Sequence, residues 1–247
     1  MTSPVRFPAG VTNRVKANPL GMMGQLDPTK YYTFFDDFDT WVTDTSGVAK
    51  YTITTTEGGS GDATEALADA ANGVLVITND GADNDCDWLQ KIGENFLLAS
   101  GKKLFFKARF KVSDATQSDW VMGLQVTDTT PLDTGGDGVS DAIFFQKDDG
   151  DTNIDFYMQK TTSAQVTNTA VTTAAADDTY MTLGFYFDGA RYVDLYKDDV
   201  KVYTADFGAT LATNLPDTEL TVSFGIQNGA AAAKVLSVDY IFAAQER

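Results

Sequence analysis

The sequence contains no histidine and a single cysteine, Cys86. These absences exclude a Ser-His-Asp triad, a Cys-His nucleophile, an imidazole zinc site and a disulfide within one chain. No apolar run approaches the roughly 18 residues that a membrane-spanning helix needs. Met1 is also not followed by the apolar stretch of a secretory signal. Carboxylate chemistry, calcium binding or a purely structural role remain open.

Basic residues are scarce, with 18 Lys and Arg against 35 Asp and Glu and a net charge of -17. An acidic surface repels phosphate backbones and anionic lipids, so we expect no direct binding of nucleic acid or membrane. Residues 1–30 have the opposite balance and hold four of the six prolines, without a strand or helix period. We predict an extended N-terminal arm over 1–30, either free or ordered against a neighbouring subunit, and one domain over 31–247.

Alternation of apolar and polar residues dominates the rest of the chain, and it is clearest in KKLFFKARFKV at 102–112. Such a period of two predicts strands, with a core face and, in this segment, a basic outer face. About a dozen such segments are separated by Gly, Asp, Asn and Thr. Asp188-Gly189 and Asp198-Asp199 predict two hairpin turns. Only Asp62–Ala71 looks helical, for one or two turns.

Long alternating strands without intervening helices predict an all-β, two-sheet antiparallel sandwich, with a closed barrel as the alternative. Five segments resemble the concanavalin-A-like (laminin-G-like) jelly-roll sandwiches. They are FFDDFDTW at 34–41, GVLVITND at 73–80, the strand at 103–112, FYFDGARYVDLYKDDVKVY at 185–203 and VDYIFAAQER at 238–247. The resemblance implies a jelly roll over residues 31–247.

The sandwich, together with an arm that begins MTSPVRFPAG and loops rich in Thr, Ala and Asp, is similar to virion proteins of tailed bacteriophages. That resemblance implies a capsid decoration or cement protein on the virion surface, assembled in the host cytoplasm. Its partners would be the major capsid protein and copies of itself, in a homo-oligomer such as a trimer. Within the arm we expect Arg6, Phe7, Arg14 and Lys16 to make the contacts.

Enzymatic activity is not expected from the acidic residues. Laminarinase-type glycoside hydrolases of this fold carry a Glu-x-Asp-x-Glu strand, because retaining hydrolysis needs two carboxyl groups about 5 Å apart. The five glutamates never share a strand at that spacing. The aspartates of Asp36-Asp37-Asp39 and Asp148-Asp149-Asp151 suit turns, where Asp bonds to its own backbone. We therefore expect a protein that is not an enzyme.

Calcium is the one cofactor that the sequence leaves open. Asp133, Asp137 and Asp141 recur every four residues in the glycine-rich segment DTGGDGVSD. Flexible Asp/Gly loops can supply the six to eight oxygens that calcium takes, although this spacing is not that of an EF-hand. A solvated loop without any cofactor is the simpler interpretation. Cys86 lies between two carboxylates, which raise a thiol pKa, so we expect no reactive thiol.

A glycan-binding module, on a tail fibre or as a free lectin, is the alternative function. Sugar sites stack an exposed aromatic ring on the pyranose and bind its hydroxyls with Asp, Asn and backbone groups. Trp41, Trp88 and Trp120 are the candidates, although each has apolar neighbours that favour core packing. Among the alternating residues of 192–203, some tyrosines are expected to face outward, toward a sugar or a protein partner.

Overall fold

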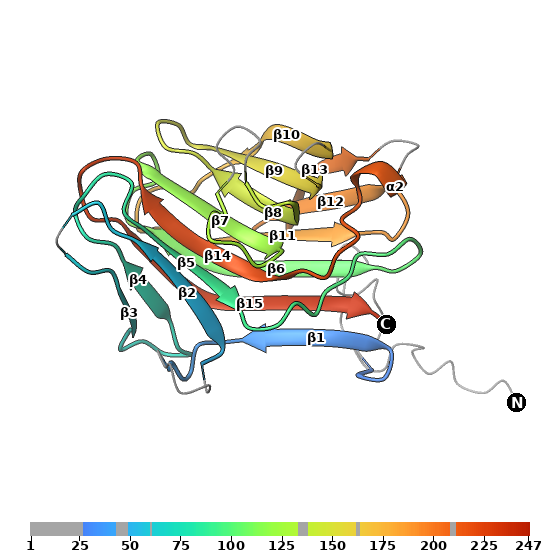
Figure 1. The fold of residues 1–247 in the computed structure, drawn as a ribbon, viewed down its shortest axis with the longest axis horizontal. Helices are drawn as coiled ribbons and strands as arrows, with labels where there is room; N and C mark the ends of the chain where they lie inside the picture. The colour runs from blue at the N-terminus through green and yellow to red at the C-terminus, as the bar shows by residue number, and fades with distance from the viewer. Residues whose placement is uncertain (1–26, 43–48, 60, 133–137, 162–163, 208–210) are drawn as a thin grey trace, which may run out of the picture.

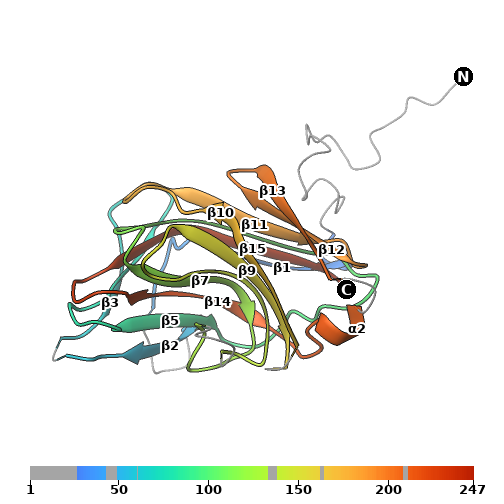
Figure 2. The ribbon, with the colours of Figure 1, turned by 90° about the horizontal axis from the view of Figure 1, so that it is seen from above.

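The computed structural model describes residues 27–42, 49–59, 61–132, 138–161, 164–207 and 211–247, which form two antiparallel sheets packed face to face (Figures 1 and 2). Sheet A contains β1 (Tyr31–Asp36), β3 (Thr64–Leu67), β4 (Leu75–Thr78), β6 (Leu104–Val112), β11 (Met181–Phe187), β12 (Tyr192–Lys197), β13 (Val200–Asp206) and β15 (Val235–Glu246). Sheet B contains β2 (Tyr51–Thr56), β5 (Cys86–Lys91), β7 (Ser118–Gln125), β8 (Asp141–Lys147), β9 (Asn153–Lys160), β10 (Ala164–Thr173) and β14 (Thr221–Asn228). The predicted all-β sandwich is confirmed.

The strand order shows that the sheets remain separate. Sheet A runs β13-β12-β11-β6-β15-β4-β3, with β1 also paired to β15, and sheet B runs β10-β9-β8-β7-β14-β5-β2. No strand of the described ranges is shared between the two sheets, so the barrel alternative is wrong. Neighbours such as β6 and β15 lie far apart in sequence, so these central pairings are long-range.

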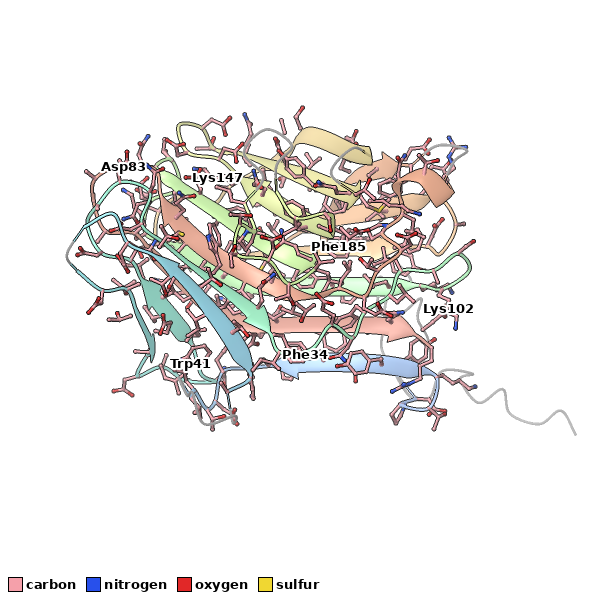
Figure 3. The ribbon with its side chains drawn as sticks, viewed as in Figure 1. Phe34, Trp41, Asp83, Lys102, Lys147 and Phe185 are labelled. Carbon is pink, nitrogen blue, oxygen red and sulfur yellow. The ribbon has the colours of Figure 1, made fainter. Side chains whose placement is uncertain are left out.

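The core between the sheets is rich in phenylalanine, in line with the alternation of the sequence. Phe106 of β6 stacks on Phe185 of β11 at 5.1 Å between ring centroids, and both side chains are fully buried. Phe185, which is labelled in Figure 3, lies in the interior of the molecule. Its ring also contacts those of Phe145 and Phe156 across the sandwich, at 6.0 and 5.7 Å between centroids. Every second residue of β6 thus packs inside the sandwich, and this buried apolar area is the main stabilising contribution to the fold.

The outer face of β6 is basic, as predicted, and its charges are paired. Lys107 forms an ion pair with Asp199, Arg109 with Asp239 and Lys111 with Asp178. Phe105 breaks the pattern, since it lies on the outer face and yet is 4% exposed. It belongs to an outer-face cluster with Tyr186, Tyr196 and Ala244.

Both predicted hairpin turns are confirmed. Gly189 has φ +81° in the turn between β11 and β12. Asp198 and Asp199 have φ 49° and 63°, the left-handed pair that a two-residue hairpin turn requires.

The helix expected at Asp62–Ala71 is wrong. Residues 64–67 form β3, which pairs with β4 from Thr64 opposite Thr78 to Leu67 opposite Leu75. The helical propensity of this Ala-rich segment is weak for so short a stretch, and the hydrogen bonds offered by β4 outweigh it. The helix that does form in the described residues, α2 (Leu211–Asn214), has no counterpart among the predictions.

Most of the arm, including Arg6, Phe7, Arg14 and Lys16, lies outside the described residues, so their contacts stay predictions. The described chain begins with a turn at 27–30, where Lys30 and Tyr31 donate backbone hydrogen bonds to the Asp27 carbonyl. The strand β1 follows directly. In the part of the chain that the structure describes, no helix is long and apolar enough to cross a membrane.

Candidate functional site

Two of the three tryptophans are buried, Trp120 between the two sheets and Trp88 in a separate cluster on the outer face of sheet B. Trp120 is 0% exposed and packs edge-on against Phe110 at 5.0 Å, and Trp88 is 3% exposed. Neither presents a ring face to a ligand. Trp41 is half-buried, stacks on Tyr51 at 5.8 Å, and borders a hollow of about 210 Å³ with Thr40, Val42 and Lys50. Of the three predicted sugar platforms, only Trp41 reaches the surface.

The predicted calcium ligands are not brought together in the described structure. Asp133 and Asp137 lie outside the described residues. Asp141 opens β8, is 3% exposed, and has one carboxylate oxygen without a hydrogen-bond partner. Across the described ranges, no group of three His, Cys, Asp or Glu side chains is arranged to hold a metal ion. Calcium binding therefore stays a prediction.

The outer face of sheet B is closed where loop residues 126–132 are bound to it. The Gln90 side chain donates to the Val126 carbonyl and accepts from the Asp128 amide, and the Gln125 side chain donates to the Pro131 carbonyl. Beside these bonds lies a small apolar cluster that includes Trp88, Phe144 and Tyr157, all at most 8% exposed. The described residues of this part of the face are therefore covered by the loop and the cluster.

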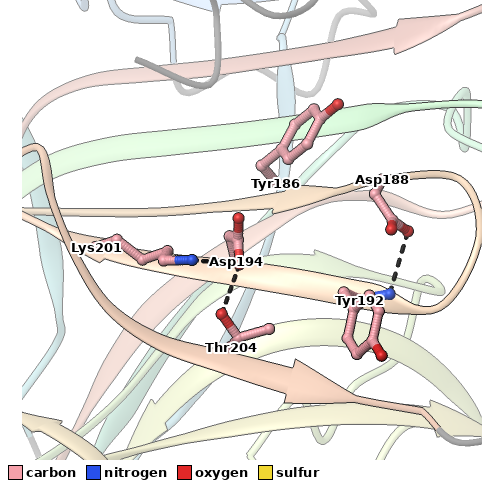
Figure 4. Close-up of a pocket in the computed structure, with 6 residues that line it drawn as sticks. All are labelled: Tyr186, Asp188, Tyr192, Asp194, Lys201 and Thr204. Atoms are coloured by element: carbon pink, nitrogen blue, oxygen red, sulfur yellow. Dashed lines mark hydrogen bonds and ion pairs between the residues drawn. The ribbon is translucent and has the colours of Figure 1, made fainter. Parts of the chain in front are cut away.

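A pocket of about 300 Å³ opens on the outer face of sheet A (Figure 4). Its lining residues are Tyr186 from β11, Asp188 from the following turn, Tyr192 and Asp194 from β12, and Lys201 and Thr204 from β13. Antiparallel pairing places Tyr186 opposite Asp194, and Asp194 opposite Thr204, so these side chains share one face of the sheet. The pocket is thus built from three consecutive strands joined by two tight turns.

The two carboxylates of the pocket are fixed differently. Asp188 receives three backbone N–H groups on one oxygen, from Ala190, Arg191 and Tyr192, at 2.8 to 3.1 Å. Asp194 accepts hydrogen bonds from the Thr204 hydroxyl at 2.6 Å and the Lys201 ammonium at 3.3 Å. Both carboxylates are therefore held in place before any ligand arrives.

The two tyrosines of the pocket differ in exposure. Tyr192 is 41% exposed, and the Arg191 guanidinium lies 5.3 Å from the centre of its ring. Arg191 is itself held by Asp206. Tyr186 is 6% exposed, and burial, followed by the charges of Asp188 and Glu246, raises its pKa to about 12. Its hydroxyl is therefore a neutral donor at neutral pH, and it has no hydrogen-bond partner among the described residues.

The sequence pattern pointed to this region only in part. Outward-facing tyrosines were expected among residues 192–203, and Tyr192 and Tyr203 are indeed exposed, at 41% and 40%. Tyr196, in contrast, is buried, and its pKa is raised to about 12 by burial and by Asp194. The contribution of Tyr186 and Asp188 was missed. The sequence indicates only a turn at Asp188. It does not predict the register shift between β12 and β13, which places Lys201 opposite Tyr196.

Comparison with known proteins identifies the fold. No protein-family model and no curated protein sequence matches the chain. An endo-1,3-beta-glucanase from Streptomyces sioyaensis is similar in structure, with 15% sequence identity and a TM-score of 0.58 over 90% of this chain and 99% of that chain. A glycoside hydrolase family 16 endo-glucanase from Bacteroides ovatus has 15% identity and a TM-score of 0.56 over 84% of this chain and 98% of that chain. The Emp47p carbohydrate recognition domain has 12% identity and a TM-score of 0.55 over 88% of this chain and 97% of that chain.

The chain thus has the two-sheet jelly-roll fold of these structures, which fits the resemblance to concanavalin-A-like sandwiches. The expectation of a protein that is not an enzyme is corrected by the comparison, because two endo-glucanases share the fold over nearly their whole length. A missing Glu-x-Asp-x-Glu strand argues against one hydrolytic mechanism and not against all enzymatic activity. None of the three structures is described as a virion protein, so the capsid role stays a prediction.

Proposed function

We propose that this protein binds glycans, and that the pocket on the outer face of sheet A is the binding site. The observation that carries the proposal is the pair of carboxylates, Asp188 and Asp194, that are held in place in the pocket beside an exposed tyrosine ring. Groups that are already fixed lose little freedom when they bind sugar hydroxyls. Tyr186 also lines the pocket, and its hydroxyl, which has no hydrogen-bond partner among the described residues, is a further donor to a sugar.

The rest of the lining has the composition of a sugar site. The exposed ring of Tyr192 offers an apolar face for stacking on the C–H groups of a pyranose. Carboxylates and an ammonium group, from Asp188, Asp194 and Lys201, also line the pocket and can bind several hydroxyls. The contact of Tyr192 with Arg191 restrains the ring, which lowers the entropy lost on binding.

The structural comparison supports a carbohydrate ligand of some kind. One of the similar structures is a carbohydrate recognition domain and two are endo-glucanases, although their identities of 12 to 15% fix the fold alone. The pocket volume of about 300 Å³ lies at the lower end of the range for small-ligand sites, which fits one or two sugar units of a longer chain.

Replacing Tyr192 with alanine tests the site directly. After a glycan array has identified ligands, we expect Tyr192→Ala to weaken binding roughly tenfold, the value of one aromatic stacking contact. Tyr186→Phe is expected to weaken it several-fold, because it removes one hydrogen bond and little volume. Isothermal titration calorimetry measures both effects, and assay of reducing ends shows whether the bound glycan is also cleaved.

The matched control is Tyr240→Ala. Tyr240 lies on β15 of the same sheet and does not line the pocket. We expect wild-type affinity for this variant. If no glycan on the array binds, the proposed function is wrong. If glycans bind and Tyr192→Ala leaves the affinity unchanged, the protein binds glycans elsewhere and the pocket is not the site.

A further inference from the structure

We infer that the pocket selects glycans carrying free amino groups, such as de-N-acetylated hexosamine chains, over neutral or acidic glycans of the same length. The inference rests on the proposed glycan-binding function and adds the ligand class. Its basis is the charge distribution of the pocket, in which an uncompensated carboxylate lies beside an exposed aromatic ring.

The lining residues carry two carboxylates, Asp188 and Asp194, and one cation, Lys201. The Lys201 ammonium lies 3.3 Å from Asp194 and forms an ion pair with it. No ion pair of the described residues includes Asp188, whose partners are backbone N–H groups of its own turn. The pocket therefore keeps one full negative charge, centred on Asp188.

Charged groups around the pocket do not cancel this charge. Arg191 is the nearest cation in sequence, and two of its guanidinium nitrogens donate hydrogen bonds to the two oxygens of the Asp206 carboxylate. Glu246 of β15 adds a further negative potential, since it acts on Tyr186 together with Asp188 and Asp194. Lys102 lies with Glu246 in a separate hollow of about 250 Å³, which Lys30 and Arg247 also line.

The geometry of Asp188 suits an ammonium group. Its three backbone hydrogen bonds all reach one oxygen, and the second oxygen accepts none among the described residues. A carboxylate oxygen that already lies at a pocket can accept a charge-assisted hydrogen bond, which is about twice as strong as a neutral one. The Arg191 guanidinium lies over one face of the Tyr192 ring, so a ligand cation would gain attraction from the ring quadrupole at the opposite face.

An uronic acid in the same position would place its carboxylate against Asp188, and like charges at short range are repelled. An N-acetyl group would neutralise the amine and remove the charge-assisted bond. The charge of the pocket therefore predicts an order of affinity in which free-amine sugars bind most tightly, neutral sugars less and uronic acids least.

The experiment titrates the full chain with glucosamine oligomers and N-acetylglucosamine oligomers of equal length, in mildly acidic buffer where the free amines are protonated. We expect the free-amine oligomers to bind about tenfold more tightly, which corresponds to about 1.4 kcal/mol. Asp188→Asn should remove most of this preference, because asparagine keeps the turn hydrogen bonds and loses the charge.

Because the whole chain is acidic, Asp83→Asn is the matched control for general attraction of a polycation. Asp83 is exposed and lies far from the pocket. Figure 3 shows Asp83 and Lys102 at opposite ends of the molecule, and the Lys102 backbone lies next to Gly189, in the turn that holds Asp188. This variant should keep the full preference for amines. Equal losses in both variants would show non-specific attraction and overturn the inference. Equal binding of acetylated and free-amine oligomers would overturn it and leave the proposed function intact, whereas binding of no sugar of any class would overturn both.

Discussion

Replacing Asp87 with asparagine should make the protein less sensitive to alkaline pH. Asp87 of β5 is fully buried, and burial, aided by Glu65 and Glu57, raises its pKa from 3.8 to about 8. The Thr55 hydroxyl donates to one of its oxygens, and the other oxygen is buried without a hydrogen-bond donor among the described residues. Glu65 belongs to sheet A, so the two carboxyl groups meet between the sheets.

The sign of the effect follows from proton linkage. Between pH 4 and pH 8 the folded protein keeps the proton of Asp87, whereas the unfolded chain has lost it. The free energy of unfolding therefore decreases as the pH rises through this window. From pH 6 to pH 8 the loss due to Asp87 amounts to about 2 kcal/mol, at 1.36 kcal/mol for each pKa unit. Asp87→Asn cannot ionise, and its amide N–H can donate to Glu65.

Urea unfolding of both proteins at pH 6 and pH 8 measures this difference. Between pH 6 and pH 8 the free energy of unfolding of the variant should decrease by about 2 kcal/mol less than that of the wild type. Burial raises the pKa of Asp119 to about 6, so Asp119 makes the free energy of unfolding depend on pH below this window. This dependence is the same in both proteins. The exposed Asp83→Asn variant should behave as the wild type. Identical losses in wild type and Asp87→Asn would mean that Asp87 is already ionised in the folded protein.

Gly225→Ala is expected to destabilise the fold strongly. Gly225 lies in the middle of β14, paired with Trp88 on one side and Val121 on the other. A Cβ atom there would lie 2.2 Å from the Asp87 carbonyl oxygen and 2.6 Å from the Trp88 ring. These distances are far inside van der Waals contact. Relief requires β14 and β5 to separate, which breaks ladder hydrogen bonds.

We expect a loss of about 3 kcal/mol in the free energy of unfolding for this variant, the upper part of the range for overpacked cores. Gly81→Ala is the matched control, because the nearest atom to its added Cβ is 4.0 Å away. That variant should change stability by no more than about 0.5 kcal/mol. Urea denaturation compares the two, and a loss below 1 kcal/mol for Gly225→Ala would contradict the close approach of β5 and β14.

Local sequence signals determined most of the secondary structure. Alternation in segments such as 104–112 places bulky residues on one side, and burying them requires a second layer, so a sandwich follows without any knowledge of partners. Turn residues at Asp188-Gly189 and Asp198-Asp199 fix the hairpins, because they tolerate positive φ. The absence of histidine excluded whole classes of active site. These features depend on neighbours in sequence, so they can be read directly.

Only the tertiary structure decided the features that depend on long-range pairing. The segment at 64–67 became β3 because β4 was available as a partner. Trp120 is withdrawn from solvent because it packs in the core between the sheets, and Trp88 because an apolar cluster covers it on the outer face of sheet B. Asp87 and Glu65 meet only because opposite sheets bring them together. The charge of the candidate pocket likewise depends on which cation reaches which carboxylate, and that is fixed by strand register across the sheet and not by local propensity.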